Sequence, residues 1–433
     1  MSTPLRACRA ALAFAVLVPA VASAQPPRNP FAELFGRATE RSGREFTAVQ
    51  FRSTAGAQFG QTLEQEDQPP DTVIPEGISG GADGALNVEY MRDRVQVVGQ
   101  GRYSYQEYRR EPAFGAPSFD AGLAANLKPT TRLSFQAGGH FTRSPFFRLL
   151  WLAPDPVATM PLDRSAILLM QNDTVEGSAG FTSQYTKRSS LTVSGQARET
   201  SFAASPAQNF QSIGGRAQWK RQMNRDVAIR AGYGREQLLQ RFDGVDTVYT
   251  NELLDIGVDY AKALSLARRT SLSFSTETSM LRDTFGTRHF RLNGTAILER
   301  RFERSWLVQV SARRSTEFLP GFRAPVFTEH GHFVLAGYLA KRLALNVNAD
   351  GGQGEAGFND PRKFISYGGD AKLTLAVTRH LGLFTQYVYY HYQMPPDPLT
   401  LFLLPQGARQ AVSIGVNTWV SIFDKEKVTR DPR

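Results

Sequence analysis

The chain has 433 residues, of which 41% are hydrophobic and 11% aromatic, and its formal net charge is +10. The mean hydropathy is −0.31, and beyond the N-terminus no run reaches the ~18 apolar residues that a membrane helix needs. These values exclude a protein that spans a membrane with helices. They allow two or three soluble domains or one large β-barrel, because a barrel strand is only half apolar.

Residues 1–24 have the organisation of a secretory signal peptide. Arg6 and Arg9 supply the positive charge, and an apolar core follows at residues 10–18. The core is too short to span a membrane, and residues 22–24, Ala-Ser-Ala, form a cleavage site. The sequence therefore predicts an exported protein.

The single cysteine, Cys8, lies inside this signal. The mature chain is then expected to form no disulfide and no thiolate metal site. Removing Arg6 and Arg9 lowers the formal charge from +10 to +8. An exported basic chain is expected to meet anionic lipid head groups or anionic solutes, and no nucleic acid.

Residues 25–44 form a polar segment that contains prolines. Two interpretations are open: a tail that hangs in the periplasm, or a small plug inside a barrel. The mobile tail is favoured, because chain termini are usually loose unless something holds them.

Several segments alternate apolar or small residues with polar ones. The stretches Arg132–Phe141, Leu191–Arg198 and Leu343–Asp350 each place apolar or small side chains on one face and mainly polar ones on the other. A strand projects successive side chains to opposite faces, so each stretch predicts a two-faced β-strand. Such strands recur from residue 45 to residue 423, joined alternately by tight turns and longer loops.

This pattern predicts an all-β fold, a transmembrane antiparallel up-and-down β-barrel of about 18 strands, or 16 if the first pair is irregular. The predicted strands are 45–59, 80–92, 94–109, 119–128, 131–144, 174–187, 189–203, 210–221, 225–241, 249–262, 270–284, 288–301, 305–318, 328–341, 343–357, 364–378, 380–394 and 409–423.

The last predicted strand, residues 411–423, carries Gly415, Trp419 and Phe423. In this strand the chain resembles bacterial outer-membrane porin-like barrels, whose last strand is read by the barrel-assembly machinery. The resemblance covers residues 45–423 as architecture. It implies an outer-membrane location with contact to lipid and lipopolysaccharide. The chain departs from the family in one respect, because a polar extension, residues 424–433, follows the terminal aromatic residue.

The polar faces of the strands supply candidate pore-lining residues. The basic candidates concentrate in the first half of the barrel and the acidic ones in the second. This order predicts two opposed charged walls and a field across the pore, while ordinary hydrated or paired wall charges are the alternative. The candidates are Arg102, Arg132, Arg198, Arg216 and Arg230, and Asp255, Asp259, Glu277, Asp350 and Asp370.

The longest predicted loop, residues 144–173, lies between the fifth and sixth strands and is unusually apolar. Porin-like barrels commonly fold the loop at this position inward. The resemblance therefore implies a constriction that includes Phe147, Arg148, Trp151 and Asp155. Extension of the barrel wall and contact with lipid are the alternatives, since an exposed apolar run of this size needs a partner.

The six histidines form no motif with a serine that indicates a hydrolase. His330 and His332 share a strand face, as two metal ligands would, but an exposed histidine pair is the favoured interpretation. We therefore expect no enzyme, no cofactor and no metal site. The sequence predicts an outer-membrane channel for passive diffusion of small hydrophilic solutes, with a mild anion preference. The alternatives are an export barrel for an acidic polysaccharide and a closed structural or adhesive barrel.

Overall fold

A computed structural model of the chain describes residues 45–65, 77–108, 114–144, 171–202, 209–242, 245–263, 270–282, 287–302, 305–318, 325–357, 362–393 and 407–427. Within these ranges all regular structure is β-strand, and no helix is long and apolar enough to cross a membrane. The expected signal peptide, the N-terminal tail and the core of the apolar loop lie outside the described residues.

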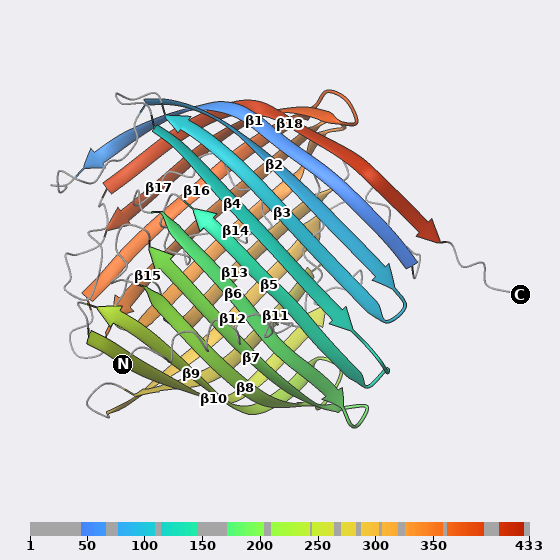
Figure 1. Cartoon of the computed structure of the whole chain (residues 1–433), viewed down its shortest axis with the longest axis vertical. Coiled ribbons are helices and arrows are strands. Elements are labelled where there is room, and N and C mark those ends of the chain that lie inside the picture. The colour runs from blue at the N-terminus through green and yellow to red at the C-terminus, as the bar shows by residue number, and fades with distance from the viewer. Residues whose placement is uncertain are drawn as a thin grey trace, which may run out of the picture.

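The described residues form eighteen strands, which confirms the predicted count and fold class (Figure 1). Their bounds are β1(Glu45–Gln65), β2(Gly77–Arg92), β3(Val95–Tyr108), β4(Phe114–Leu127), β5(Leu133–Ser144), β6(Asn172–Gln184), β7(Ser189–Phe202), β8(Phe210–Gln222), β9(Val227–Phe242), β10(Val245–Ala263), β11(Thr270–Arg282), β12(Arg288–Phe302), β13(Trp306–Glu317), β14(Val326–Ala340), β15(Leu343–Ala356), β16(Arg362–Ala376), β17(Leu381–Gln393) and β18(Gly407–Lys427).

Every strand pairs antiparallel with its neighbours in the chain, and β1 also pairs with β18, so the sheet closes on itself. Even-numbered strands lead into short turns such as Asp93–Arg94 and Lys341–Arg342. We call this the short-turn end of the barrel and the opposite one the long-loop end. Asp93 has a φ of 27°, a left-handed conformation that aspartate tolerates well in a tight turn.

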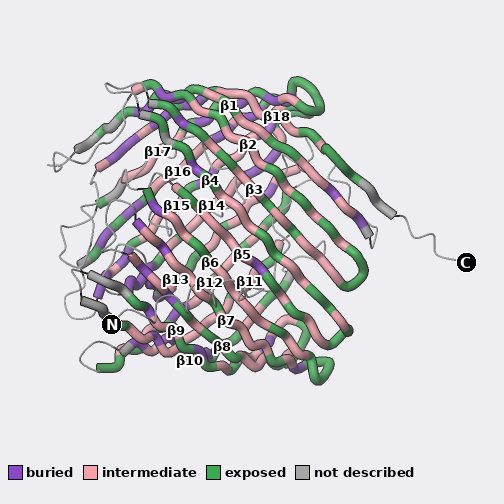
Figure 2. Tube along the Cα trace, in the orientation of Figure 1, coloured by how far each residue is buried: buried purple, intermediate pink, exposed green. Residues whose placement is uncertain are grey.

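The outer face of the barrel is apolar, and Figure 2 shows exposed and partly buried residues alternating along near strands such as β2 and β3. Leu123, Ile213 and Ile256 expose 59%, 63% and 63% of their surface. Because neighbouring side chains in a strand point to opposite faces, the polar residues between them lie on the inner face. Leu191 lies on the outer face and Ser194 on the inner one, as the sequence predicts.

The two strands at the seam are the longest, with 21 residues each. β18 continues past Phe423, where the sequence predicts its end, to Lys427. The added residues stay in the ladder because Asp424–Lys427 pair with residues 45–48 of β1. Part of the polar C-terminal extension is therefore strand.

The ladder between β10 and β11 contains an irregularity. Leu254 pairs with Thr278 and Asp259 with Ser275, so the ladder advances five residues on β10 but three on β11. The extra residues form a β-bulge, which breaks the regular backbone pairing and re-aims side chains.

Candidate functional site: an ion-pair cluster on the inner wall

A cluster of charged side chains covers the inner face of β8, β9, β10 and β11. Arg216 on β8 forms salt bridges with Asp255 on β10 and, at 3.1 Å, with Glu277 on β11. The arginine passes over β9 at Gly234, where a Cβ atom would lie 3.3 Å from the Cβ of Arg216. The absence of a side chain at this position leaves the arginine its path across the strand.

Two further cations complete the cluster. On β9, Arg230 forms salt bridges with Asp255 at 3.5 Å and with Asp259 at 2.7 Å. Lys220 on β8 also contacts Asp259, at 2.7 Å. Three cations therefore meet the three carboxylates of Asp255, Asp259 and Glu277, and the cluster carries no net formal charge.

Asp255 is the hub of the cluster. Only 1% of its surface is exposed, and its Oδ2 accepts hydrogen bonds from Arg216 and from Gln218. Burying a carboxylate is costly unless cations and hydrogen-bond donors compensate it. The surrounding donors compensate Oδ2, while Oδ1 is buried without a hydrogen-bond partner among the described residues.

The β10 bulge contributes directly to this geometry. Arg230 donates from Nη2 to the backbone carbonyl of Thr276 on β11 at 2.8 Å. Gly257 lies inside the bulge, and a Cβ atom there would overlap the Thr276 carbonyl. The bulge and its glycine thus bring the backbone of β11 within reach of a guanidinium that belongs to β9.

The prediction of two charged walls facing each other across the pore is wrong for this cluster. Arg216 and Arg230 do not face Asp255, Asp259 and Glu277 across the interior but are ion-paired with them along the same part of the wall, Arg230 with the neighbouring strand and Arg216 across β9. The basic and acidic runs of the sequence meet at β8–β11. A guanidinium on a long side chain reaches across one strand there, and Coulomb attraction closes the pair.

Two more of the basic candidates are paired on the inner face. Arg102 on β3 contacts Asp83 on β2 at 3.2 Å. Arg198 on β7 contacts Glu176 on β6 at 3.0 Å. Each pair joins neighbouring strands, so neither arginine presents an isolated positive charge.

Arg132 lies elsewhere than expected. The sequence predicts it on a strand with its side chain inward, but β5 begins at Leu133 and Arg132 belongs to the preceding turn, where it is exposed. The backbone N–H of Arg132 is held by the Thr130 hydroxyl at 3.2 Å. This turn motif displaces the start of the strand.

The remaining acidic candidates, Asp350 and Asp370, lie on the inner face of β15 and β16. Asp370 accepts hydrogen bonds from Asn348 at 3.0 Å and from Gln386 at 3.1 Å. A row of polar side chains runs beside it across five strands in register. The row consists of Asn346, Lys372, Gln386, Ser413 and Gln58.

Most of this polar row is packed into the wall. Gln386, Ser413 and Gln58 are 2%, 3% and 4% exposed, and Lys372 is 7% exposed. The Lys372 ammonium lies 4.4 Å from the centre of the Phe384 ring, a cation–π contact. The inner wall of β15–β18 and β1 is therefore polar and dense.

A cluster of buried apolar side chains lies near the long-loop end. It contains Phe210, Leu238 and Leu281, together with Phe318, which follows β13, and Phe327 near the start of β14. Arg291 stacks over Phe327 at 4.2 Å. Phe210, Leu238 and Leu281 lie on the inner face, so the lining of the barrel is apolar at this point. The strand pattern did not predict it, because Phe318 and Phe327 flank a loop.

The residues expected to carry the assembly signal lie in β18. A Cβ atom on Gly415 would overlap the backbone carbonyl of Ala55 and lie 2.7 Å from the Phe384 ring, so the glycine allows a close contact at the seam. Trp419 stacks on His380 with ring centres 6.2 Å apart. Phe423 is 46% exposed.

The constriction residues Phe147, Arg148, Trp151 and Asp155 lie outside the described residues.

His330 and His332 stack with ring centres 6.4 Å apart. Among the described residues, no group of three or more His, Cys, Asp or Glu side chains is arranged to hold a metal ion. A second histidine pairing, His140 Nε2 with Asp120 Oδ2 at 2.7 Å, links β5 to β4. This contact orders the inner face of those strands.

No protein-family model matches the chain, and no curated protein matches it. Solved structures with a similar architecture include Pseudomonas aeruginosa OccK7 (OpdD), with 10% identity, a TM-score of 0.46 and coverage of 88% of this chain and 99% of that one. OccK3 (OpdO) from the same organism has 9% identity, a TM-score of 0.44 and coverage of 87% and 96%. The P. aeruginosa siderophore receptor PirA has 9% identity, a TM-score of 0.41 and coverage of 86% and 80%. At these values the likeness identifies no solute and no activity.

Proposed function

We propose that the chain is an outer-membrane channel through which small hydrophilic solutes diffuse passively. The observation that carries this proposal is the division of the closed barrel into an apolar outer face and an inner face lined by polar and charged side chains. An apolar exterior suits lipid, and a polar interior suits water and polar solutes. In this proposal the chain is not an enzyme, and discrimination arises from the width and charge of the interior.

A mild anion preference remains part of the proposal. It rests on the formal charge of +8 that remains after removal of Arg6 and Arg9. The paired arrangement of Arg198 and Arg216 makes the expected preference small, because each guanidinium is compensated by a carboxylate within 3.1 Å. Surface charges outside these pairs then contribute most of the selectivity.

Single-channel recording in a planar bilayer tests this function. The purified, folded barrel should produce stepwise ion conductance, with a reversal potential that favours anions slightly in a salt gradient. A barrel that is demonstrably folded and inserted but passes no ions would contradict the channel.

The apolar cluster at the long-loop end favours a second candidate, a closed structural barrel. Phe210, Leu238 and Leu281 are each 1% exposed and meet on the inner face. If they close the interior, Leu238→Ser should open a conductance that the unmodified protein lacks. If the channel is already open, the same change should enlarge the existing conductance only modestly.

The export of an acidic polysaccharide receives less support. Such a barrel is expected to present a continuous ladder of available arginines. Among the described residues, Arg102, Arg198, Arg216 and Arg230 are each paired with a carboxylate.

The proposed channel is exported through the secretory pathway. The barrel-assembly machinery recognises its strand β18, and the inserted barrel contacts lipopolysaccharide.

A further inference from the structure

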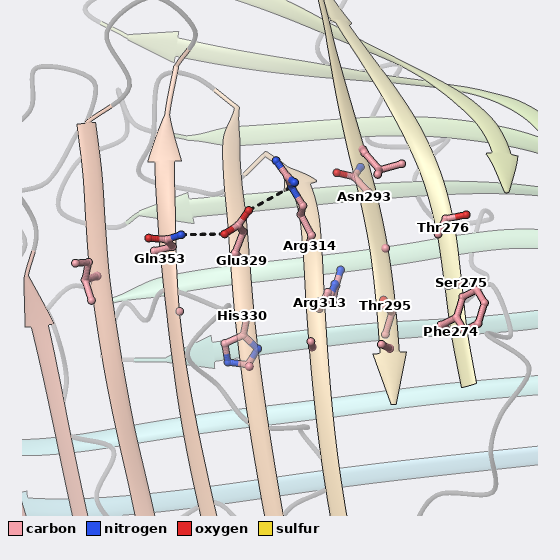
Figure 3. A pocket seen from close by; sticks show the side chains of 17 residues that line it. Phe274, Ser275, Thr276, Asn293, Thr295, Arg313, Arg314, Glu329, His330 and Gln353 are labelled. Carbon is pink, nitrogen blue, oxygen red and sulfur yellow. Dashed lines mark hydrogen bonds and ion pairs between the residues drawn. The ribbon is translucent and has the colours of Figure 1, made fainter. Parts of the chain in front are cut away.

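A groove of about 730 Å³ crosses the wall of β11–β16 toward the long-loop end (Figure 3). Small residues form its floor: Gly294 and Ala296 on β12, Ala312 on β13 and Gly331 on β14. These positions alternate with inner-face residues and share a face with exposed Leu292, so the groove opens on the outer side of the barrel. The depression exists because glycine and alanine have no large side chain to fill it.

Large apolar side chains border the groove on both sides. Phe274 and Leu292 stand on one side and Ile365 on the other, with 38%, 59% and 44% of their surfaces exposed. At Gly331 a Cβ atom would have no neighbour closer than 3.8 Å, so the floor is open at its centre. A slender apolar chain fits into this groove better than a flat protein surface does.

A polar bridge closes the groove toward the long-loop end, as Figure 3 shows. Glu329 accepts a hydrogen bond from Gln353 at 2.9 Å and forms a salt bridge with Arg314 at 3.4 Å. Arg314 and Glu329 remain 51% and 50% exposed. The bridge therefore offers guanidinium and amide donors together with carboxylate and amide acceptors, and it carries no net formal charge.

The position of this bridge along the barrel axis corresponds to the border between the hydrocarbon and the head groups of a bilayer. Arg314, Glu329 and Gln353 each lie three positions from the end of their strand at the long-loop end. Residues 306–314 of β13 comprise nine residues, and a tilted strand crosses the hydrocarbon in about 9–11 residues. The apolar groove then lies within the hydrocarbon, and the bridge lies at the level of the lipid head groups.

We infer that this groove seats an acyl chain of lipid A, the glycolipid of the outer leaflet, with the polar bridge contacting its sugar-linked amide and hydroxyl groups. The inference rests on the proposed outer-membrane insertion, with the long-loop end outward. A hydroxyacylated sugar presents both donors and acceptors at the head of its chains. That chemistry complements a bridge that itself contains both.

Native mass spectrometry of the full-length mature barrel tests the inference. The protein is refolded in detergent and titrated separately with purified lipid A and with phosphatidylethanolamine. The unmodified barrel should retain one lipid A molecule. Gly331→Trp, which fills the floor, should lower that retention at least tenfold. Gly215→Trp is the matched control, because Gly215 lies on the outer face of β8 with its nearest contact at 3.7 Å, and retention should be unchanged.

Heat-modifiable migration and conductance of all three proteins separate this inference from the proposed function. Loss of lipid A from the Gly331→Trp barrel with normal folding supports the inference, whether or not the barrel conducts. Equal retention in both variants, a preference for phosphatidylethanolamine, or no retained lipid in the unmodified barrel overturns it. A dimer that disappears in Gly331→Trp also overturns it, because the occupant would then be a second copy of the chain.

Discussion

Arg230 on β9 donates a hydrogen bond to the backbone carbonyl of Thr276 on β11 at 2.8 Å, across the full width of β10. Adjacent strands lie ~4.8 Å apart, so the side chain spans two inter-strand spacings. The same guanidinium contacts Asp255 and Asp259 on the strand between. One side chain thereby joins three strands at the point where their backbone ladder is interrupted, which makes the cluster a structural element of the wall as well as a charged surface.

Removing the hub of this cluster should destabilise the barrel. Asp255→Asn removes the carboxylate that Arg216 and Arg230 share, although Arg216 keeps Glu277 and Arg230 keeps Asp259. Loss of a charged hydrogen-bond partner at a buried site then costs about 1–3 kcal/mol. The free energy of unfolding in lipid vesicles, measured by denaturant titration, checks the result. Asp173→Asn, which breaks the exposed pair with Arg143, is the control and should have little effect. Equal losses in the two variants would contradict the central role of Asp255.

The assignment of faces predicts an asymmetry between two positions on β7. Val193 shares the outer face with exposed Leu191 and lies deeper in the strand. An arginine at Val193 should destabilise the barrel by up to about 2–4 kcal/mol, the cost at the midplane of the bilayer. Ser194→Arg places the same side chain on the inner face, where it should alter conductance more than stability. Unfolding in vesicles and single-channel recording measure the two effects. Similar destabilisation at both sites would mean that the faces are exchanged.

Neutralising either residue of the Arg198–Glu176 pair should change the ion selectivity of the channel. Glu176→Gln leaves the arginine uncompensated and should move the reversal potential toward anion selectivity. Arg198→Gln should move it toward cations. Both shifts should shrink at high salt, because the Debye length falls from ~10 Å at 0.1 M to ~3 Å at 1 M. Unchanged selectivity at 0.1 M in both variants would place these charges away from the path of the ions.

Closure of the barrel should be sensitive to Gly415. A methyl group at this position meets the carbonyl of Ala55 and the ring of Phe384, so Gly415→Ala forces β1 and β18 apart. We expect a lower yield of the heat-modifiable folded form. Gly101→Ala is the control, since a Cβ atom there has no neighbour within 4 Å. A normal yield from Gly415→Ala would show that the seam can accommodate the added methyl group.

The strands could be predicted from the sequence because each must place apolar residues on one face and polar or small ones on the other. The alternation of Leu191, Val193 and their neighbours identifies a strand without knowledge of its partners. The contacts of Arg216 are different. They depend on Gly234, on the bulge of β10 and on how far a guanidinium extends over the wall, and none of these follows from the period of a single strand.

The displacement of Arg132 has a similar cause. The alternating pattern includes it, but Thr130 caps the turn through hydrogen bonds to the N–H groups of Arg132 and Leu133 at 3.2 Å and 3.1 Å. The outer groove was also invisible in the sequence. Gly294, Ala312 and Gly331 lie far apart in the chain and become one depression only when the register of β12–β14 aligns them.

The overhang of β18 has a consequence for how the protein keeps apart from other chains. β17 pairs with β18 only as far as Thr418, whereas β18 continues to Lys427 beside β1. Beyond Trp419, whose N–H is bound by His380, the described residues supply no strand on that side. An open edge of this kind invites a foreign strand to join the sheet. Residues 424–427 read Asp-Lys-Glu-Lys, and a charged sequence is one of the means by which edge strands discourage such an addition. We therefore expect the polar extension to limit edge-to-edge aggregation of the barrel.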